Sequence, residues 1–158
     1  MARAAVSEAL RELLEGPCGL IIGAVGADGL PHAGYAWGLR VLDAGTSIRV
    51  IAESGPAFNV GAAMAVTGSD VGTYRTIQIK GVIRSAEAAT PEDLYLAKVH
   101  IEQFVSEVVT VEQSPREAVE SFPSIEFDVY VVDIEEVFDQ SPGPNAGTAV
   151  DARAWRAT

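Results

Sequence analysis

The sequence predicts a mainly β protein, a small closed β-barrel that carries peripheral helices. The expected elements follow the order β-β-β-α-β-β-α-α-β within 158 residues. Residues 76–83 alternate in the way that a half-buried strand does. The apolar face of this strand carries Ile77, Ile79 and Ile83, and its polar face carries Thr76, Gln78 and Lys80. Asp28-Gly29 lies between two strand-like segments and is a strong hairpin signal.

The composition indicates an ordinary globular chain and excludes several partners. Hydrophobic residues make up 48% and charged residues 21% of the sequence. A net charge of −11, with the basic residues scattered, argues against nucleic acid and against acidic membrane surfaces. No stretch is apolar enough to predict a spanning helix, and the acidic N-terminal segment is not a signal peptide. A single cysteine, Cys18, cannot form an internal disulfide, so a cytoplasmic protein is expected.

The first part of the chain is expected to form a helix followed by an antiparallel meander. Ser7 is placed to cap a helix within residues 1–16. Turn residues separate three strands, expected at 18–25, 32–41 and 47–53. Ser54 is then expected to cap a short helix, with Phe58 and Met64 as its buried anchors.

The second part is expected to hold two more strands, two helices and a last strand. The pair of strands meets at a glycine-containing turn, and the second strand extends to about residue 86. Thr90 and the acids after it predict a helix start, and Ser114 with Glu117 is interpreted as a capping box for a short second helix. The apolar stripe of the longer helix is Leu94, Ala97, Ile101, Phe104, Val105 and Val108.

The last strand, expected at 125–138, is apolar on both faces. Phe127, Val129 and Val131 lie on one face, and Tyr130, Val132 and Ile134 lie on the other. This pattern indicates either a central barrel strand or a subunit interface. Residues 141–158, which contain several Pro and Gly, are expected to form an irregular tail.

Hydrolytic or metal-based chemistry is hard to assemble from these residues. The two histidines, His32 and His100, do not belong to a metal-ligand pair, so no zinc site is expected. Cys18 opens an apolar strand and is interpreted as a core residue. No phosphate-binding glycine loop or nucleophile elbow is present in the sequence. An enzyme with this sequence would therefore take its chemistry from a cofactor.

The segment Tyr74-Arg75-Thr76-x-Gln78-x-Lys80-Gly81 resembles the pyridoxamine 5′-phosphate oxidase-like family, the FMN-binding split barrels. Residues 37–39, 51–54 and 137–140 resemble further stretches of that family. The resemblance implies one split β-barrel domain over 1–158, a homodimer with sites between subunits, and FMN as cofactor. The cofactor-binding residues that it implies are Trp37, Gly38, Leu39, Ala52, Glu53, Ser54, Tyr74, Arg75, Thr76, Gln78 and Lys80.

One departure from the family bears on the phosphate of FMN. Members with tight FMN sites commonly carry Arg or Lys where this chain has Ala57 and Phe58, and an Arg on the second strand near the position of Trp37. Each lost charge-assisted hydrogen bond costs about 1.5–3 kcal/mol, so weak FMN binding is expected. Oxidation of pyridoxamine phosphate is not expected, because a phosphorylated substrate beside FMN would need still more basic residues.

Two functions stay open on the sequence alone. The first is an FMN-binding oxidoreductase of unknown substrate, with a deazaflavin as another cofactor to consider. The alternative is a flavin-free dimeric split barrel with a small-ligand-binding or structural role. Single residues also have two interpretations. Trp37 is alternatively a core or dimer aromatic, Arg75 the ion-pair partner of Asp70 or another acid, and Lys80 and Glu53 solvated surface charges.

Overall fold

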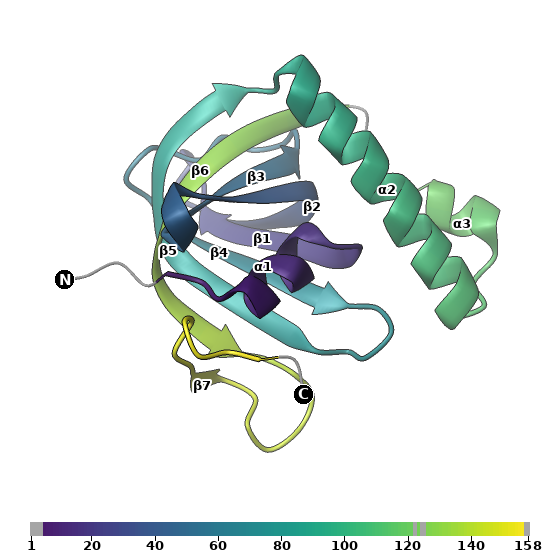
Figure 1. The fold of residues 1–158 in the computed structure, drawn as a ribbon. Coiled ribbons are helices and arrows are strands. Elements are labelled where there is room, and N and C mark those ends of the chain that lie inside the picture. Colours follow the sequence, from purple (N-terminus) through teal and green to yellow (C-terminus); the bar gives the residue numbers. More distant parts are fainter. Residues whose placement is uncertain (1–4, 122, 124–125, 157–158) are drawn as a thin grey trace.

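The computed structural model describes residues 5–121, 123 and 126–156, which form a β-barrel with helices around it (Figure 1). The barrel strands are β1 (Cys18–Val25), β2 (Pro31–Leu42), β3 (Ser47–Glu53), β4 (Ala63–Asp70), β5 (Thr76–Ala88) and β6 (Phe127–Asp139). They run antiparallel in the order β3-β2-β1-β4-β5-β6, and pairing of β3 with β6 closes the barrel. Closure removes the free edges that an open sheet would expose. The mainly β barrel predicted from the sequence is confirmed.

The barrel interior is filled by the alternating apolar residues of the strands. Ile77, Ile79 and Ile83 are fully buried in this core, as the alternation of β5 predicts. Bulges in the pairing of β5 with β6 let the two long strands bend around the barrel. Gly81 lies at one of them, where a Cβ atom would overlap the carbonyl oxygen of Asp133.

Helix α1 (Glu8–Glu15) adds two leucines to the same core. Ser7 accepts a hydrogen bond from the Leu10 amide at 3.2 Å, so the expected cap is present. Leu10 and Leu14 are completely buried against the strands. Cys18 is also buried there, and burial raises the pKa of its thiol to about 12. The interpretation of Cys18 as a core residue is confirmed.

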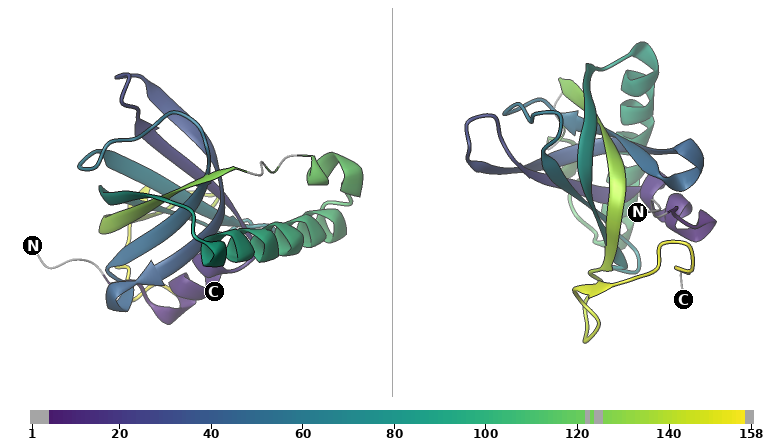
Figure 2. Two further views of the ribbon diagram at one scale, coloured as in Figure 1. Left: turned by 90° about the horizontal axis from the view of Figure 1, so that it is seen from above. Right: turned by 90° about the vertical axis from the view of Figure 1, so that its left-hand side faces the viewer.

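Helices α2 (Pro91–Val111) and α3 (Arg116–Glu120) lie outside the barrel wall (Figures 1 and 2). Thr90 and Asp93 form the capping box that starts α2. The expected apolar stripe is wrong at Leu94, which is 46% exposed, because the neighbouring Asp93 turns toward the barrel instead. The capping box expected at Ser114 is also wrong, since α3 begins one residue later with Pro115 as an N-cap that makes no side-chain bond.

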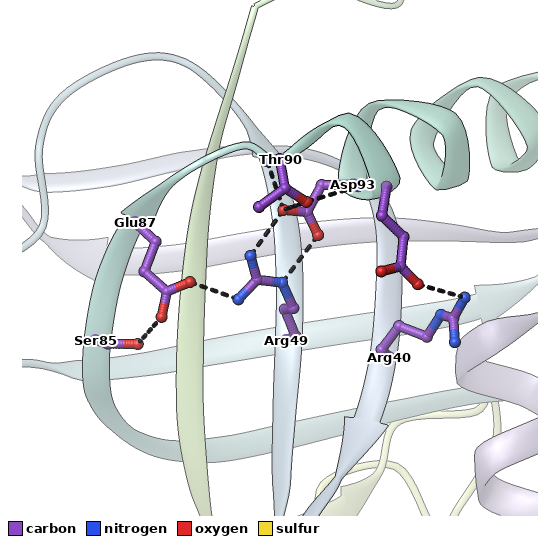
Figure 3. Close-up of polar contacts among 7 residues, drawn as sticks. Arg40, Arg49, Ser85, Glu87, Thr90 and Asp93 are labelled. Carbon is purple, nitrogen blue, oxygen red and sulfur yellow. Dashed lines mark hydrogen bonds and ion pairs between the residues drawn. The ribbon is translucent and has the colours of Figure 1, made fainter.

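Asp93 faces inward because it binds an arginine of β3 whose side chain is 18% exposed. Arg49 donates from Nε and Nη2 to the Asp93 carboxylate at 2.9 and 2.7 Å (Figure 3). Its Nη1 donates to Glu87 Oε2 at 2.6 Å. The bidentate bond to Arg49 lowers the pKa of Asp93 to about 2. This network ties the start of α2 to strands β3 and β5, and so fixes where the helix crosses the barrel wall.

Strand β6 is buried on both faces within a single chain. Tyr130, Val132 and Ile134 point into the barrel core. Val129, on the opposite face, packs with Trp37 beneath α2. The barrel and its helix therefore account for the two apolar faces, and the pattern does not require a subunit interface.

The short helix expected at Ser54 is absent from the structure. Residues 54–62 form turns and irregular chain, and Met64 belongs to β4 instead. The backbone of this loop bonds partly to other segments: the Ala27 amide donates to the Ala57 carbonyl, and the Gly61 amide donates to the Ile83 carbonyl. Phe58 is buried as expected, edge-on to Tyr130 with ring centroids 5.5 Å apart.

The C-terminal segment, residues 141–156, is mostly turns and irregular chain, but it packs on the barrel, which the sequence did not predict. It contains β7 (Thr148–Ala149), which pairs with the end of β6 below the barrel (Figure 1). Trp155 is only 6% exposed and joins the main core together with Ala152. Ser7 Oγ donates to the Trp155 carbonyl at 2.8 Å, so the segment also holds the start of α1.

Candidate functional site

The outer face of the barrel carries the polar side chains of the sequence motif. Ile21 on β1 lies opposite both Tyr35 on β2 and Thr67 on β4, and Thr67 lies opposite Gln78 on β5. This register forms one row across four strands on the outside of the barrel. Gln78 Nε2 donates to Thr67 Oγ1 at 3.2 Å. The segments around residues 37 and 78 therefore share one outer surface, with strands β1 and β4 between them.

A cavity of about 350 Å³ lies between α2, α3 and the outer face of β1, β2 and β4; we call it the α2 pocket. Its apolar lining includes Ile21, Tyr35, Trp37, Val71, Phe104, Val108 and Val119. Its polar lining comprises Ser69, Asp70, Tyr74 and Glu112. Ligand sites in proteins combine an apolar enclosure with a few polar groups in this way.

The rings of Trp37, Tyr35 and Phe104 form one wall of the α2 pocket. Trp37 meets Phe104 edge to face, with centroids 5.5 Å apart, and lies 6.0 Å from the Tyr35 ring. Trp37 Nε1 donates to Glu53 Oε1 at 2.7 Å, which fixes the orientation of the indole. Gly19 lies opposite Phe104, and a Cβ atom there would be 3.4 Å from the ring. The aromatic wall is thus held in place by both strands and helix.

His100 lies behind this wall and is only 5% exposed. Its ring stacks on Phe104 at an interplanar angle of 7°. No hydrogen-bond partner of Nε2 is found among the described residues. Burial lowers the pKa of His100 to about 4, because a charged imidazole loses its hydration there. The histidine is therefore neutral at ordinary pH.

We expect acid to destabilise the protein through His100. Between the ordinary pKa of 6.5 and the folded value of about 4, the unfolded chain takes up a proton that the folded chain does not. Above pH 6.5 His100 is neutral in both states and does not affect the free energy of unfolding. As the pH falls from 6.5 toward 4, His100 lowers the free energy of unfolding by an amount on the order of 3 kcal/mol. In His100→Leu this part of the acid dependence is removed, which urea unfolding at a series of pH values measures. If the free energy of unfolding depends on pH in the same way in both proteins from pH 7 to 4, His100 is not the source of this acid dependence.

The mouth of the α2 pocket is formed by the turn between β4 and β5. Asp70 Oδ2 accepts hydrogen bonds from the Thr73 amide at 2.8 Å and from Thr73 Oγ1 at 2.7 Å. Tyr74 follows with a φ of +58°, a left-handed conformation that costs energy for a residue with a large side chain. This backbone geometry places an exposed tyrosine ring beside the pocket. Such strain is a feature of ligand-binding segments.

The structure brings some of the residues implied by the resemblance together. Trp37 and Tyr74 both line the α2 pocket, and Glu53 holds the Trp37 indole. Thr76 Oγ1 lies 2.7 Å from Oγ of Ser69, which also lines the pocket. These residues come from three separate stretches of the sequence.

Other implied residues lie elsewhere. The side chains of Leu39 and Ala52 are part of the barrel core. Gly38 is covered by Ile51, whose Cδ1 would lie 2.8 Å from a Cβ at that glycine. The amide of Ser54 donates to a carbonyl of the chain entering β6.

The two basic residues of the motif do not line the α2 pocket. The Arg75 guanidinium lies over the Trp155 ring, 5.1 Å from its centroid. Lys80 Nζ lies 4.7 Å from the centroid of Phe138 and borders a second hollow on the outer face. That hollow has a floor of small residues and also contains two acids, Glu135 and Glu136. Neither basic side chain of the motif therefore places a positive charge in the α2 pocket.

Sequence reasoning missed several lining residues. Tyr35 is two residues before Trp37 on one strand, so the strand alternation could have predicted that both rings lie on the same face. Phe104 lies on the long helix and Glu112 is its C-cap, and nothing in the sequence indicates which strands that helix crosses. Within the described ranges, no group of three or more His, Cys, Asp or Glu is placed to bind a metal. In the same part of the chain, no helix is long and apolar enough to cross a membrane.

Solved structures similar to this fold include two with TM-scores above one half. HupZ from Group A Streptococcus is 13% identical, with 90% of this chain and 99% of that chain covered and a TM-score of 0.53. An F420 reductase is 17% identical, with 84% and 98% covered and a TM-score of 0.51. These likenesses, with the closed six-stranded barrel, show the split β-barrel fold that the sequence resemblance predicts.

A putative pyridoxamine 5′-phosphate oxidase from Lactobacillus delbrueckii is also similar, at 18% identity over 87% of this chain and 95% of that chain, with a TM-score of 0.48. No protein-family model and no curated protein sequence matches this chain.

Proposed function

We propose that this chain binds a small planar molecule in the α2 pocket, with a flavin-type ring as the first candidate and an oxidoreductase role. The observation that carries the proposal is the aromatic cavity of about 350 Å³, which joins Trp37 and Tyr74 from two separate motif segments. A cavity of roughly 300–1,000 Å³ is the usual size for a small-molecule site. When bound, a flavin-type ring would supply hydride transfer.

The residues present fit the ring portion of such a cofactor. Trp37, Tyr35 and Phe104 offer apolar surface to a planar ring, and Glu53 keeps the indole in one orientation. Ser69 and Asp70 add hydrogen-bonding atoms to the pocket lining. One structural relative is named an F420 reductase, so a deazaflavin is a ligand to test beside FMN.

The phosphate portion of FMN does not fit. Among the described lining residues there is no Lys or Arg, whereas Asp70 and Glu112 both carry negative charge. A dianionic phosphate needs charge-assisted hydrogen bonds that this lining does not provide. The pocket is therefore expected to recognise the ring and to gain little or nothing from the phosphate.

A titration of FMN and riboflavin tests this expectation. We expect micromolar or weaker dissociation constants for both ligands, measured by quenching of flavin fluorescence, and riboflavin should bind at least as well as FMN. A nanomolar constant for FMN with about a hundredfold preference over riboflavin, near 3 kcal/mol, would show a phosphate site that the described residues do not explain.

The second candidate function is a flavin-free dimer that holds another small ligand or has a structural role. It is favoured by exposed apolar residues on the outer face of the β1–β2 hairpin, namely Ile21, Val25 and Tyr35. A second copy seated on this face would shield them from solvent. A colourless preparation that takes up no added flavin, but sediments as a dimer, would support this candidate.

Association itself is tested by sedimentation of the wild-type protein and of Ile21→Lys. We expect a dimer for the wild type and a shift toward monomer for the variant; a wild-type monomer at micromolar concentration would contradict dimerisation. Ile134 is unsuitable for this test, because it lies in the barrel core and a charge there would unfold the chain.

A further inference from the structure

We infer that the α2 pocket selects aromatic ligands that carry a positive charge, the chemical class of arylalkylamines. The inference rests on the proposed function, since it concerns the same pocket, and it adds the charge of the ligand. Three features support it: the carboxylates of the lining, the binding of nearby arginines to groups outside the pocket, and the aromatic rings of the lining.

The charged groups that line the pocket are acids. Asp70 lies at the end of β4, and Glu112 is the C-cap of α2. The turn bonds from Thr73 go to Oδ2 of Asp70, so Oδ1 is not used by that turn. The C-terminal end of α2 adds the negative end of a helix dipole on the same side as Glu112. All three contributions attract a cation and repel an anion.

Arginines on the surrounding elements are held by other groups. Arg75, next to the mouth, lies over the Trp155 ring and donates to the Arg156 carbonyl at 3.3 Å. Arg116 on α3 pairs with Glu120 on the same helix at 3.3 Å. The acids of the pocket are therefore not neutralised by a lining cation within the described part of the chain.

The aromatic rings act in the same direction as the acids. A cation close to the face of Trp or Tyr is attracted by the ring quadrupole, and aromatic cages for ammonium groups use this effect. Trp37 and Tyr35 lie side by side on β2, and the exposed Tyr74 ring stands at the mouth. An aromatic body would pack on the wall of Trp37 and Phe104 while its ammonium group meets the carboxylates.

Three indole ligands of similar size but different charge test the inference. Tryptamine is a cation, tryptophol is neutral, and indole-3-acetate is an anion. Their binding to the wild-type protein is measured by calorimetry at low ionic strength. We expect tryptamine to bind about three- to tenfold more tightly than tryptophol, and indole-3-acetate to bind most weakly. Added salt is expected to reduce these differences.

Two variants localise the preference. Glu112→Gln and Asp70→Asn each remove one lining charge and keep a hydrogen-bonding oxygen, so each is expected to reduce the tryptamine preference severalfold. Glu102→Gln is the matched control, since it makes the same charge change on the exposed face of α2 without lining the pocket. Thermal melts check that each variant is folded.

The outcomes separate this inference from the proposed function. Equal affinities for the three indoles, or riboflavin binding without any indole binding, would overturn the charge selection and leave the α2 pocket as a ring site. If Glu102→Gln reduces the preference for tryptamine as much as Glu112→Gln does, the preference comes from the net charge of the protein. That result would also overturn the inference. If neither riboflavin nor any indole binds, the proposed function itself fails.

Discussion

Arg49→Met is expected to destabilise the protein by about 3–5 kcal/mol, because it leaves the buried Asp93 carboxylate, and also Glu87, without its guanidinium partner. Asp93 is almost completely buried and would lose both of its bonds from the guanidinium, and Glu87 would lose one. Urea unfolding measures the loss. The matched control is Arg40→Met, which breaks the ion pair between Arg40 Nη2 and Glu92 Oε1. These atoms are 3.8 Å apart, and both side chains are largely exposed. That control is expected to cost less than about 1 kcal/mol.

The same network predicts a dependence of stability on acid pH. The folded pKa of Asp93 is lowered to about 2 from an ordinary 3.8, chiefly by its hydrogen bonds from Arg49. The carboxylate therefore contributes stability that is complete above pH 3.8 and is lost as the pH falls toward 2. In Arg49→Met this contribution should be absent. Equal costs for the Arg49 and Arg40 variants would contradict the role given to the network.

Trp155→Ala is expected to cost about 3–5 kcal/mol, because it removes a large buried ring from the C-terminal segment and leaves a cavity. The ring is part of the main core and also contacts the Arg75 guanidinium. The control is Tyr95→Ala, since Tyr95 is 66% exposed on α2 and its truncation should change stability by about 0.5 kcal/mol or less. Unfolding curves for Trp155→Ala that match those of Tyr95→Ala would show that the segment does not stabilise the barrel.

The barrel was predictable because its signals are local. Alternation in β5 and the Asp28-Gly29 turn specify strands and a hairpin without reference to the rest of the chain. The burial of Trp155 was not predictable, since it depends on contacts with Ser7, 148 positions away. Proline and glycine between residues 141 and 147 correctly indicate irregular chain, but they carry no information about whether residues 148–156 pack on the barrel.

The candidate site was predictable only in part, for two physical reasons. A bulge in the pairing of β2 with β3, between Ala36 and Leu39, breaks the alternation of the strand. Trp37 therefore faces the α2 pocket while Leu39, two residues later, faces the core. The helical wall depends on where α2 lies, and the contact between Arg49 and Asp93, 44 positions apart, sets that position.

The placement of the ligand in the α2 pocket is tested most directly by filling each of the two hollows in turn. Val108→Trp adds a large ring to the helical wall of the α2 pocket, and Ala65→Trp adds the same ring to the floor of the second hollow, which Lys80 borders. Riboflavin affinity is measured for both folded variants. We predict that Val108→Trp loses about tenfold or more in riboflavin affinity, near 1.4 kcal/mol, and that Ala65→Trp leaves the affinity unchanged. Wild-type affinity in Val108→Trp, with binding lost in Ala65→Trp, would contradict this prediction and move the site to the second hollow.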